Sequence, residues 1–289
     1  MMQPAVSRRG FLGAAVAGGL AGWAARPNFA RADDAADRFG GFPLGIQSYT
    51  LRAYALDTTL QIIHEDLGLH FVEIATTHLP VDAKEEQVQK VLAQAKSLGI
   101  KIAGHGVNGF GGDHDANRRV FEFAKRIGAR TISADPSPEA FESLDKLVVE
   151  YDIRIAIHNH GPGARYDKVT DVLTAIKGHH PSIGACADLG HYIRAGEDPV
   201  RVIHLLAGRL YGLHLKDYDA PKKDARGVIL GKGLLDLAGV FGALKKVDFP
   251  ADGCLSVEYE EKQNDPVDDV KACLAACEEG AQKAMRSKA

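Results

Sequence analysis

The segment IRIAIHNHG, residues 153–161, has the alternation of a β-strand that ends in a histidine. Because successive strand residues point to opposite faces, its three isoleucines share one face and His158 ends the other. Segments 182–188, 209–215 and 253–259 repeat this alternation between an apolar face and a face of small and polar residues. In these three segments the mixed face ends in Asp188, His214 and Glu258.

Strand and helix patterns alternate through the rest of the chain as well. Four further strands are predicted at 44–49, 70–75, 100–106 and 130–134. Helices are predicted at 58–67, 84–98, 113–127, 138–150, 167–177, 199–207, 234–246 and 267–285. Eight strand-helix units predict an α/β fold with one closed (β/α)8 TIM barrel. A doubly wound open sheet is the alternative, but it would be shorter, and no Gly-rich phosphate turn follows the first strand.

Several predicted helices stop at a glycine that leads directly into the next strand: Gly68, Gly99 and Gly128. Glycine tolerates the left-handed conformation that such stops require.

The polar face of the first four strands carries Gln47, Glu73, His105 and either Ser133 or Asp135. Since catalytic groups of this fold lie at the carboxyl ends of the strands, we expect the active site at that mouth of the barrel.

The first 32 residues have the order of a secretory signal of the twin-arginine kind. Paired arginines in Ser7-Arg-Arg-Gly-Phe-Leu12 precede an uncharged run at 11–25, and Ala30-Arg-Ala32 supplies a cleavage site. We therefore predict a signal peptide at 1–32, a linker at 33–42 and the barrel at 43–289. The expected consequence is export by the twin-arginine translocase to the periplasm, without a stable membrane span. A chance arginine pair in a disordered N-terminus, or an uncleaved anchor, is the alternative.

Charge and cysteine content narrow the classes of function. Cleavage would remove four arginines and change the net charge from −3 to −7, which does not suit a nucleic-acid-binding protein. The spacing of Cys186, Cys254, Cys273 and Cys277 matches no zinc motif. Cys273 and Cys277 lie four residues apart on a predicted helix, where packing is a simpler role than a disulfide.

Four polar strand ends form a candidate metal site. Imidazole nitrogens and carboxylate oxygens suit Mn²⁺, Zn²⁺, Co²⁺ or a similar divalent ion such as Mg²⁺. The predicted ligands are His158, Asp188, His214 and Glu258. Such a site could keep positions open for substrate oxygens. The alternative is a polar mouth that binds a ligand without metal.

Neighbouring residues are candidates for substrate contact and catalysis. His160 could replace His158 as ligand, or it could act as a base or substrate contact. His191, in a loop after the sixth strand, could bind a sugar hydroxyl, bind a second ion or cap a helix. Lys216 could hold a carbonyl oxygen, or be a surface lysine paired with Asp217. Gln47, Glu73 and His105 are predicted substrate contacts, with a buried structural role as the alternative for the last two. Residues 109–112 are expected to form a mobile loop.

The ordered elements resemble the xylose isomerase-like TIM-barrel superfamily, which includes sugar phosphate isomerases and epimerases, inosose dehydratases and, more distantly, endonuclease IV. The elements that carry the resemblance are Glu73, His105-Gly, His158-Asn-His160, Asp188-x-Gly-His191, His214-x-Lys-Asp217, Gly231-Lys-Gly233 and Glu258. The resemblance implies a metal held by Asp188, His214 and Glu258, with His191 near the substrate. Ketose epimerases of this group carry a glutamate where this chain has His158, and this departure puts two-sided proton exchange in doubt. A histidine at this position looks closer to the dehydratase-like branch and to exported relatives that act on 3-keto-sugars.

We therefore expect a metal-dependent sugar isomerase or epimerase that abstracts a proton next to a carbonyl of a sugar or keto-sugar. Glu258, or else His160, would take the proton. The alternatives are a lyase or dehydratase acting on a 3-keto-glycoside or inosose-like substrate, and a non-catalytic periplasmic sugar-binding protein. A nuclease needs more metal ligands than the chain offers. The expected partner is a small-molecule sugar, and an oligomer is compatible with the sequence.

Overall fold

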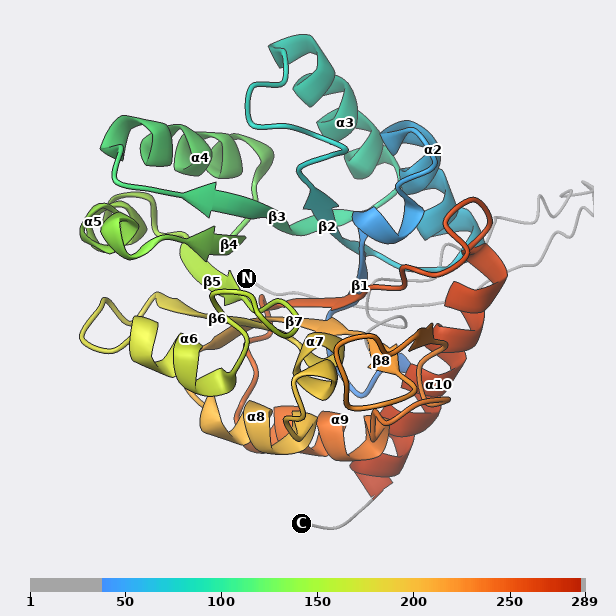
Figure 1. Cartoon of the computed structure of the whole chain (residues 1–289). Coiled ribbons are helices and arrows are strands. Elements are labelled where there is room, and N and C mark those ends of the chain that lie inside the picture. The colour runs from blue at the N-terminus through green and yellow to red at the C-terminus, as the bar shows by residue number, and fades with distance from the viewer. Residues whose placement is uncertain (1–37, 287–289) are drawn as a thin grey trace, which may run out of the picture. The chain divides into compact units, whose positions relative to one another are not determined.

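Eight parallel strands close into a barrel in the order β1-β10-β7-β6-β5-β4-β3-β2 (Figure 1). The computed structural model describes residues 38–286, so the predicted signal peptide lies outside the described residues. The barrel strands are β1 (Leu44–Gln47), β2 (Phe71–Ala75), β3 (Lys101–Phe110), β4 (Thr131–Pro136), β5 (Arg154–His158), β6 (Ile183–Asp188), β7 (Leu210–Leu215) and β10 (Cys254–Val257). The predicted (β/α)8 fold is confirmed.

Helices surround the barrel and connect its strands (Figure 1). They are α2 (Leu56–Gln61), α3 (Glu85–Ser97), α4 (His114–Ile127), α5 (Phe141–Tyr151), α6 (Val169–Ala175), α7 (Leu189–Arg194), α8 (Pro199–Leu205), α9 (Leu237–Lys246) and α10 (Val267–Arg286). Short helical turns are η1 (Ser48–Leu51), η2 (Ile62–Asp66) and η3 (Pro138–Ala140). Within residues 38–286, none of the helices has the length and apolar character needed to cross a bilayer.

The two faces of the strands separate as the alternation predicts. Ile155, Ile157, Leu213 and Leu215 are fully buried in the hydrophobic core. The predicted glycine stops are confirmed, because Gly68, Gly99 and Gly128 have φ values of +63°, +65° and +78°. These positive values explain why glycine stands at each stop.

Two cysteines occupy the interior of the barrel. Cys186 of β6 and Cys254 of β10 both pair with Gly212 of β7, from its two sides, and both are fully buried. A Cβ added at Gly212 would lie 2.9 Å from the sulfur of Cys186, and one at Gly104 would lie 2.8 Å from the sulfur of Cys254. Small strand residues therefore leave the room that the two thiols fill. All four cysteines are free and buried.

Three segments differ from the sequence prediction. β3 extends past residue 106 because Gly109 and Phe110 pair with Asp135 and Pro136 of β4, so the prediction that the loop begins at Gly109 is wrong. The glycines of residues 109–112 are typical of a loop sequence, but the adjacent strand β4 offers hydrogen-bond partners. The helix predicted at 58–67 changes from an α-helix to a π-helical turn at Ile62. A two-stranded sheet of β8 (Asp217–Tyr218) and β9 (Gly227–Val228) was not predicted.

The junction between β10 and α10 supplies a stability prediction. Asp269, which is buried, accepts hydrogen bonds from the Tyr259 hydroxyl at 2.6 Å and from Lys262 Nζ at 2.8 Å. These bonds, chiefly the one from Lys262, lower the pKa of Asp269. Asp269→Asn is expected to lower the free energy of unfolding at pH 7 by about 1–2 kcal/mol.

The effect of this substitution has a defined pH dependence. A carboxyl group whose pKa is lowered by folding stabilises the protein above its unfolded pKa of about 3.9, and this stabilisation is lost as the pH falls through the folded value. The difference between wild type and Asp269→Asn should therefore shrink below about pH 4 in denaturant titrations. Asp268→Asn, at the exposed neighbour, is the control. Equal effects of the two substitutions at pH 7 would contradict the prediction.

Candidate metal centre and active site

Four side chains from consecutive barrel strands converge at one point. His158, Asp188, His214 and Glu258 each offer one ligand atom, and these atoms all lie within 4.8 Å of one another. All four residues are buried. The structure thus brings together the complete predicted ligand set, including His158 rather than His160.

The ends of β5 and β6 are fixed to each other by an asparagine. Asn159 donates from Nδ2 to the carbonyl of Asp188 at 3.0 Å, and its Oδ1 accepts from the backbone N–H of Asp188 at 2.8 Å. Asp188 is also the N-cap of α7, because its Oδ1 accepts from the backbone N–H of His191 at 2.8 Å. This cap directs the other carboxylate oxygen toward the cluster.

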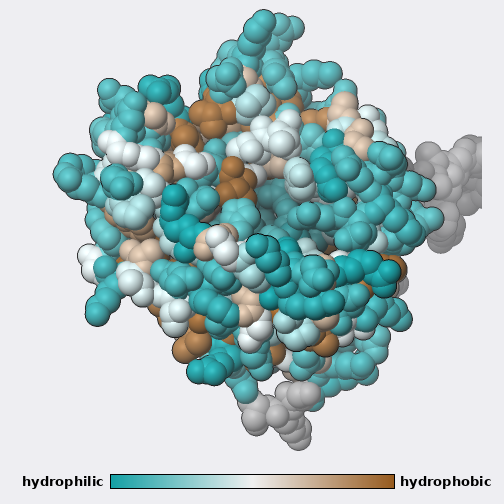
Figure 2. Space-filling model, in the orientation of Figure 1, coloured by the Kyte–Doolittle hydropathy of each residue, from teal (hydrophilic) through white to brown (hydrophobic). Residues whose placement is uncertain are grey.

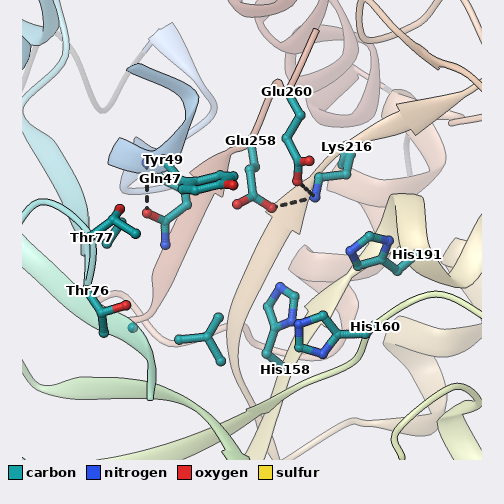
Figure 3. A pocket seen from close by; sticks show the side chains of 13 residues that line it. Gln47, Tyr49, Thr76, Thr77, His158, His160, His191, Lys216, Glu258 and Glu260 are labelled. Carbon is teal, nitrogen blue, oxygen red and sulfur yellow. Dashed lines mark hydrogen bonds and ion pairs between the residues drawn. The ribbon is translucent and has the colours of Figure 1, made fainter. Parts of the chain in front are cut away.

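His191 lies on α7 and not in a loop, so the predicted loop is wrong. The helix begins directly after Asp188 because the cap satisfies its first turn. Its ring stacks on the ring of His160, with centroids 5.8 Å apart, and both rings lie near that of His158. The three histidines lie together on one side of the cavity (Figure 3).

Glu73 fixes the orientation of His214 from inside the barrel, on the side of the cluster away from its mouth. His214 Nε2 lies 2.7 Å from Glu73 Oε2, and a carboxylate only accepts hydrogen bonds, so Nε2 carries the proton. Nδ1 faces the cluster, 3.1 Å from His158 Nε2 and 3.3 Å from Glu258 Oε2, and is the ring nitrogen that an ion would use. A carboxylate behind a histidine is a common arrangement in metal sites, where it orients the ring.

The ammonium group of Lys216 connects the cluster to the rim. Its Nζ lies 3.0 Å from Asp188 Oδ2, 2.7 Å from Glu258 Oε2 and 2.6 Å from Glu260 Oε1. The alternative that Lys216 is a surface lysine paired with Asp217 is wrong, because Lys216 is 4 % exposed and the Asp217 carboxylate accepts backbone hydrogen bonds instead.

A cavity of about 360 Å³ opens above the cluster. Figure 2 shows it as a hollow in the middle of this face, with a mainly hydrophilic rim. Its lining includes the predicted residues Gln47, His158, His160, His191, Lys216 and Glu258. Most of the predicted site residues therefore share one cavity.

Glu73 and His105 lie outside this lining. Glu73 is fully buried in the barrel, where its oxygens also contact Ser133 Oγ at 2.5 Å and Ser256 Oγ at 3.3 Å. His105 is fully buried too, with Nε2 bonded to the carbonyl of Leu79 at 2.9 Å. The structure places both residues in the buried arrangement that was their alternative.

The cavity also has lining residues that were not predicted. These are Tyr49, Ala75, Thr76, Thr77, Gly106, Val107 and Glu260. Tyr49 and Glu260 each follow a predicted site residue by two positions, so extending the alternation past the strand end would have found them. Thr76 and Thr77 directly follow β2, in a segment that strand alternation does not reach.

Burial and opposite charges shift the pKa values of the site residues. Burial opposes ionisation of Glu258, but Lys216 and His214 hold its pKa well below the usual range. Burial also opposes ionisation of Asp188, and nearby positive charge, from His191 at low pH and from Lys216, lowers its pKa nevertheless. Both carboxylates are therefore available as anionic ligands.

The histidines of the rim behave differently. Burial lowers the pKa of His191 to about 3 and also lowers the pKa of His160, the latter with a contribution from the nearby His158. Both rings are neutral near pH 7 and keep a lone pair, as a ligand or a proton acceptor requires.

The residues present fit a divalent metal ion. Asp188 Oδ2 is buried and accepts no hydrogen bond of regular geometry, and its partner is the Lys216 ammonium at 3.0 Å, so this oxygen can also serve as a metal ligand. Nδ1 of His214 and the two carboxylates of Asp188 and Glu258 point to the same place. Two nitrogen and two oxygen ligands suit ions such as Mn²⁺, Zn²⁺ or Co²⁺.

Comparisons with known proteins show which enzymes and solved structures this chain is similar to. The chain is 29 % identical over 168 residues to 3-oxo-isoapionate decarboxylase of Pectobacterium atrosepticum, an alignment that covers 52 % of this chain and 58 % of that enzyme. A crystal structure of an uncharacterised Parabacteroides distasonis protein matches with a TM-score of 0.64 and 29 % identity, covering 81 % of this chain and 97 % of the other.

A third relative shows the same fold at lower identity. The 3-keto-D-glucoside 4-epimerase of E. coli matches with a TM-score of 0.64 and 16 % identity, covering 82 % of this chain and 98 % of the other. Residues 63–280 match the sequence profile of the xylose isomerase-like TIM barrel. The chain therefore belongs to the xylose isomerase-like TIM-barrel family.

Proposed function

We propose that this protein is a divalent-metal-dependent enzyme that abstracts a proton next to a carbonyl group of a sugar or keto-sugar, with isomerisation or epimerisation as the outcome. The observation that carries the proposal is the convergence of His158, Asp188, His214 and Glu258 at the floor of an open cavity. Family membership supports it, because the relatives named above include an epimerase and a decarboxylase.

The chemistry of each residue follows from its place. A divalent ion held by the four ligands would supply Lewis acidity that polarises a carbonyl group. The Glu258 carboxylate lines the cavity and would accept the proton from carbon, and neutral His160 is the alternative acceptor. Lys216 also lines the cavity, and its N–H groups would hydrogen-bond to the developing oxygen anion.

A lyase or dehydratase is the second candidate. Proton abstraction next to a carbonyl also begins the elimination of a β-substituent, so the first step is shared. His158 favours this outcome, since it supplies no second carboxylate across from Glu258 for proton exchange on the opposite face. Product analysis with a 3-keto-glycoside separates the outcomes: an eliminated aglycone indicates a lyase, and an inverted carbon indicates an epimerase.

Metal removal tests the proposed function. Exhaustive chelation is expected to abolish turnover in a screen of hexoses, ketohexoses and 3-keto-glycosides, and adding back Mn²⁺, Co²⁺ or Zn²⁺ should restore it. Metal content of the purified protein, measured by mass spectrometry, should approach one ion per chain. Full activity of metal-free protein would contradict the proposal.

We also propose that the mature protein is exported to the periplasm. The proposal rests on the order of the arginine pair, the uncharged run and Ala30-Arg-Ala32 in the sequence. Cell fractionation followed by sequencing of the mature N-terminus tests it, and the expected first residue is Asp33.

A further inference from the structure

The charge at the rim of the cavity defines the class of substrate that can enter. Among the described residues that line the cavity, Lys216 is the one lysine, and no arginine is present. The remaining lining consists of histidines, the carboxylates of Glu258 and Glu260, and uncharged side chains such as Gln47, Thr76 and Val107. Among the lining side chains, Lys216 is therefore the one that could pair with an anionic group of a substrate.

The charge of Lys216 is already balanced by its neighbours. Two of its three carboxylate partners, Asp188 and Glu258, are predicted metal ligands. The third, Glu260, has no part in that ligand set and approaches Lys216 most closely, at 2.6 Å. A divalent ion at the cluster would balance Asp188 and Glu258, and Glu260 would then still balance Lys216 (Figure 3).

Glu260 is held in this place by an arginine. Arg52 donates from Nη2 to the carbonyl of Glu260 at 2.9 Å and from Nη1 to the carbonyl of Tyr49 at 3.1 Å. Its guanidinium lies over the Tyr49 ring, 4.5 Å from the centroid. Arg52 therefore joins two cavity-lining residues through two of its donors.

Arg194, which lies next to the lining residue His191, also donates to a backbone carbonyl. Arg194, whose Nη1 lies 3.4 Å from His191 Nδ1, donates from Nε to the carbonyl of Lys223 at 3.1 Å and from Nη2 to the same carbonyl at 2.5 Å. A phosphate or carboxylate entering the cavity would lose its hydration, and the one lining cation, Lys216, already has carboxylate partners, so entry is unfavourable.

We propose that the part of the substrate that enters this cavity is uncharged, and that Glu260 is the residue that excludes sugar phosphates and sugar acids by neutralising Lys216. The inference rests on the proposed function and names its substrate class: neutral sugars and keto-sugars.

Binding of matched pairs of sugars tests the proposal. The metal-loaded protein is titrated calorimetrically with D-fructose and D-fructose 6-phosphate, D-tagatose and D-tagatose 6-phosphate, and D-galactose and D-galacturonate. The neutral member of a pair should bind at least about tenfold more tightly, as expected for removal of one charge repulsion in a partly buried site. Glu260→Gln should reduce this preference by about tenfold.

The control is Glu261→Gln, which makes the same change in charge one residue further along, at a side chain outside the cavity lining. It should leave the preference unchanged. Thermal unfolding of both variants shows whether either has lost its fold, and Glu260, with a side chain 38 % exposed, tolerates an amide.

The possible outcomes separate the two proposals. Equal or tighter binding of the charged sugars, or a neutral preference that Glu260→Gln does not change, overturns the substrate inference and leaves the proposed reaction intact. Tight binding of neutral sugars without turnover of any of them overturns the proposed reaction alone. Absence of binding by every sugar of the panel contradicts both.

Discussion

Glu258→Gln is expected to lower kcat by about 10³-fold while ligand binding is partly retained. The carboxylate is the acceptor for the abstracted proton, and an amide cannot accept it at neutral pH. The side chain keeps its size, so the cavity keeps its shape. Lys216 Nζ, 2.7 Å from Glu258 Oε2, can still donate a hydrogen bond to the amide oxygen.

Metal occupancy must be measured together with the rate, because Glu258 is also a predicted ligand. Comparison at equal metal content separates loss of the base from loss of the ion. His160→Asn is the second arm: a larger loss there than in Glu258→Gln at equal metal content would assign the proton to His160. Glu261→Gln is the control for the change in charge.

The same experiment distinguishes an enzyme from a non-catalytic sugar-binding protein on this barrel. If the wild-type protein binds sugars and turns none of them over, and Glu258→Gln changes neither result, the binding protein is the better description. Loss of turnover with surviving binding supports the enzyme, because only a catalytic group affects the rate without affecting the ground-state complex.

The sequence alone predicted the barrel fold and the convergence of the four clustered residues. Strand alternation shows which face a residue occupies, and the carboxyl ends of parallel strands meet at one mouth, so His158, Asp188, His214 and Glu258 had to approach one another. The ion itself, the substrate and the export step stay predictions.

The alternation within one strand predicts which face a side chain occupies, but not its depth along the barrel axis. Gln47 and Glu73 are register partners on adjacent strands, yet Gln47 lines the cavity and Glu73 does not. Four groups across the barrel hold the Glu73 carboxylate below the mouth: Ser133, His214, Cys254 and Ser256. These partners come from three other strands, so only the closed structure reveals that Glu73 orients His214.

The loops were the second feature that the sequence did not predict, and the segment after β7 shows why. The sequence suggests Asp217 as a partner for Lys216 and as part of the His214-x-Lys-Asp217 element, but its carboxylate accepts five backbone hydrogen bonds of 2.8–3.0 Å. The donors are Tyr218, Gly231, Gly233, Leu234 and Leu235. One buried side chain thus organises the turn that leads into α9. A contact between residues 14 or more positions apart has no periodic signal in the sequence.

Asp217→Asn is accordingly expected to destabilise the fold by about 3–5 kcal/mol. An amide NH₂ replaces one carboxylate oxygen and faces at least two N–H donors, which leaves those donors buried without an acceptor. The charge that strengthens the remaining bonds is lost as well. Urea unfolding at pH 7 measures the change, with m-values compared to verify that both proteins unfold in the same two-state manner.

Asp219→Asn provides the matched control, because Asp219 is two residues further along, is exposed, and accepts a backbone hydrogen bond from Arg226 at 2.9 Å. Its cost should stay below about 1 kcal/mol. Since Lys216 directly precedes Asp217, Asp217→Asn should also weaken sugar binding in the fraction that remains folded. Equal stability losses for the two variants would show that the five hydrogen bonds of Asp217 do not hold this turn.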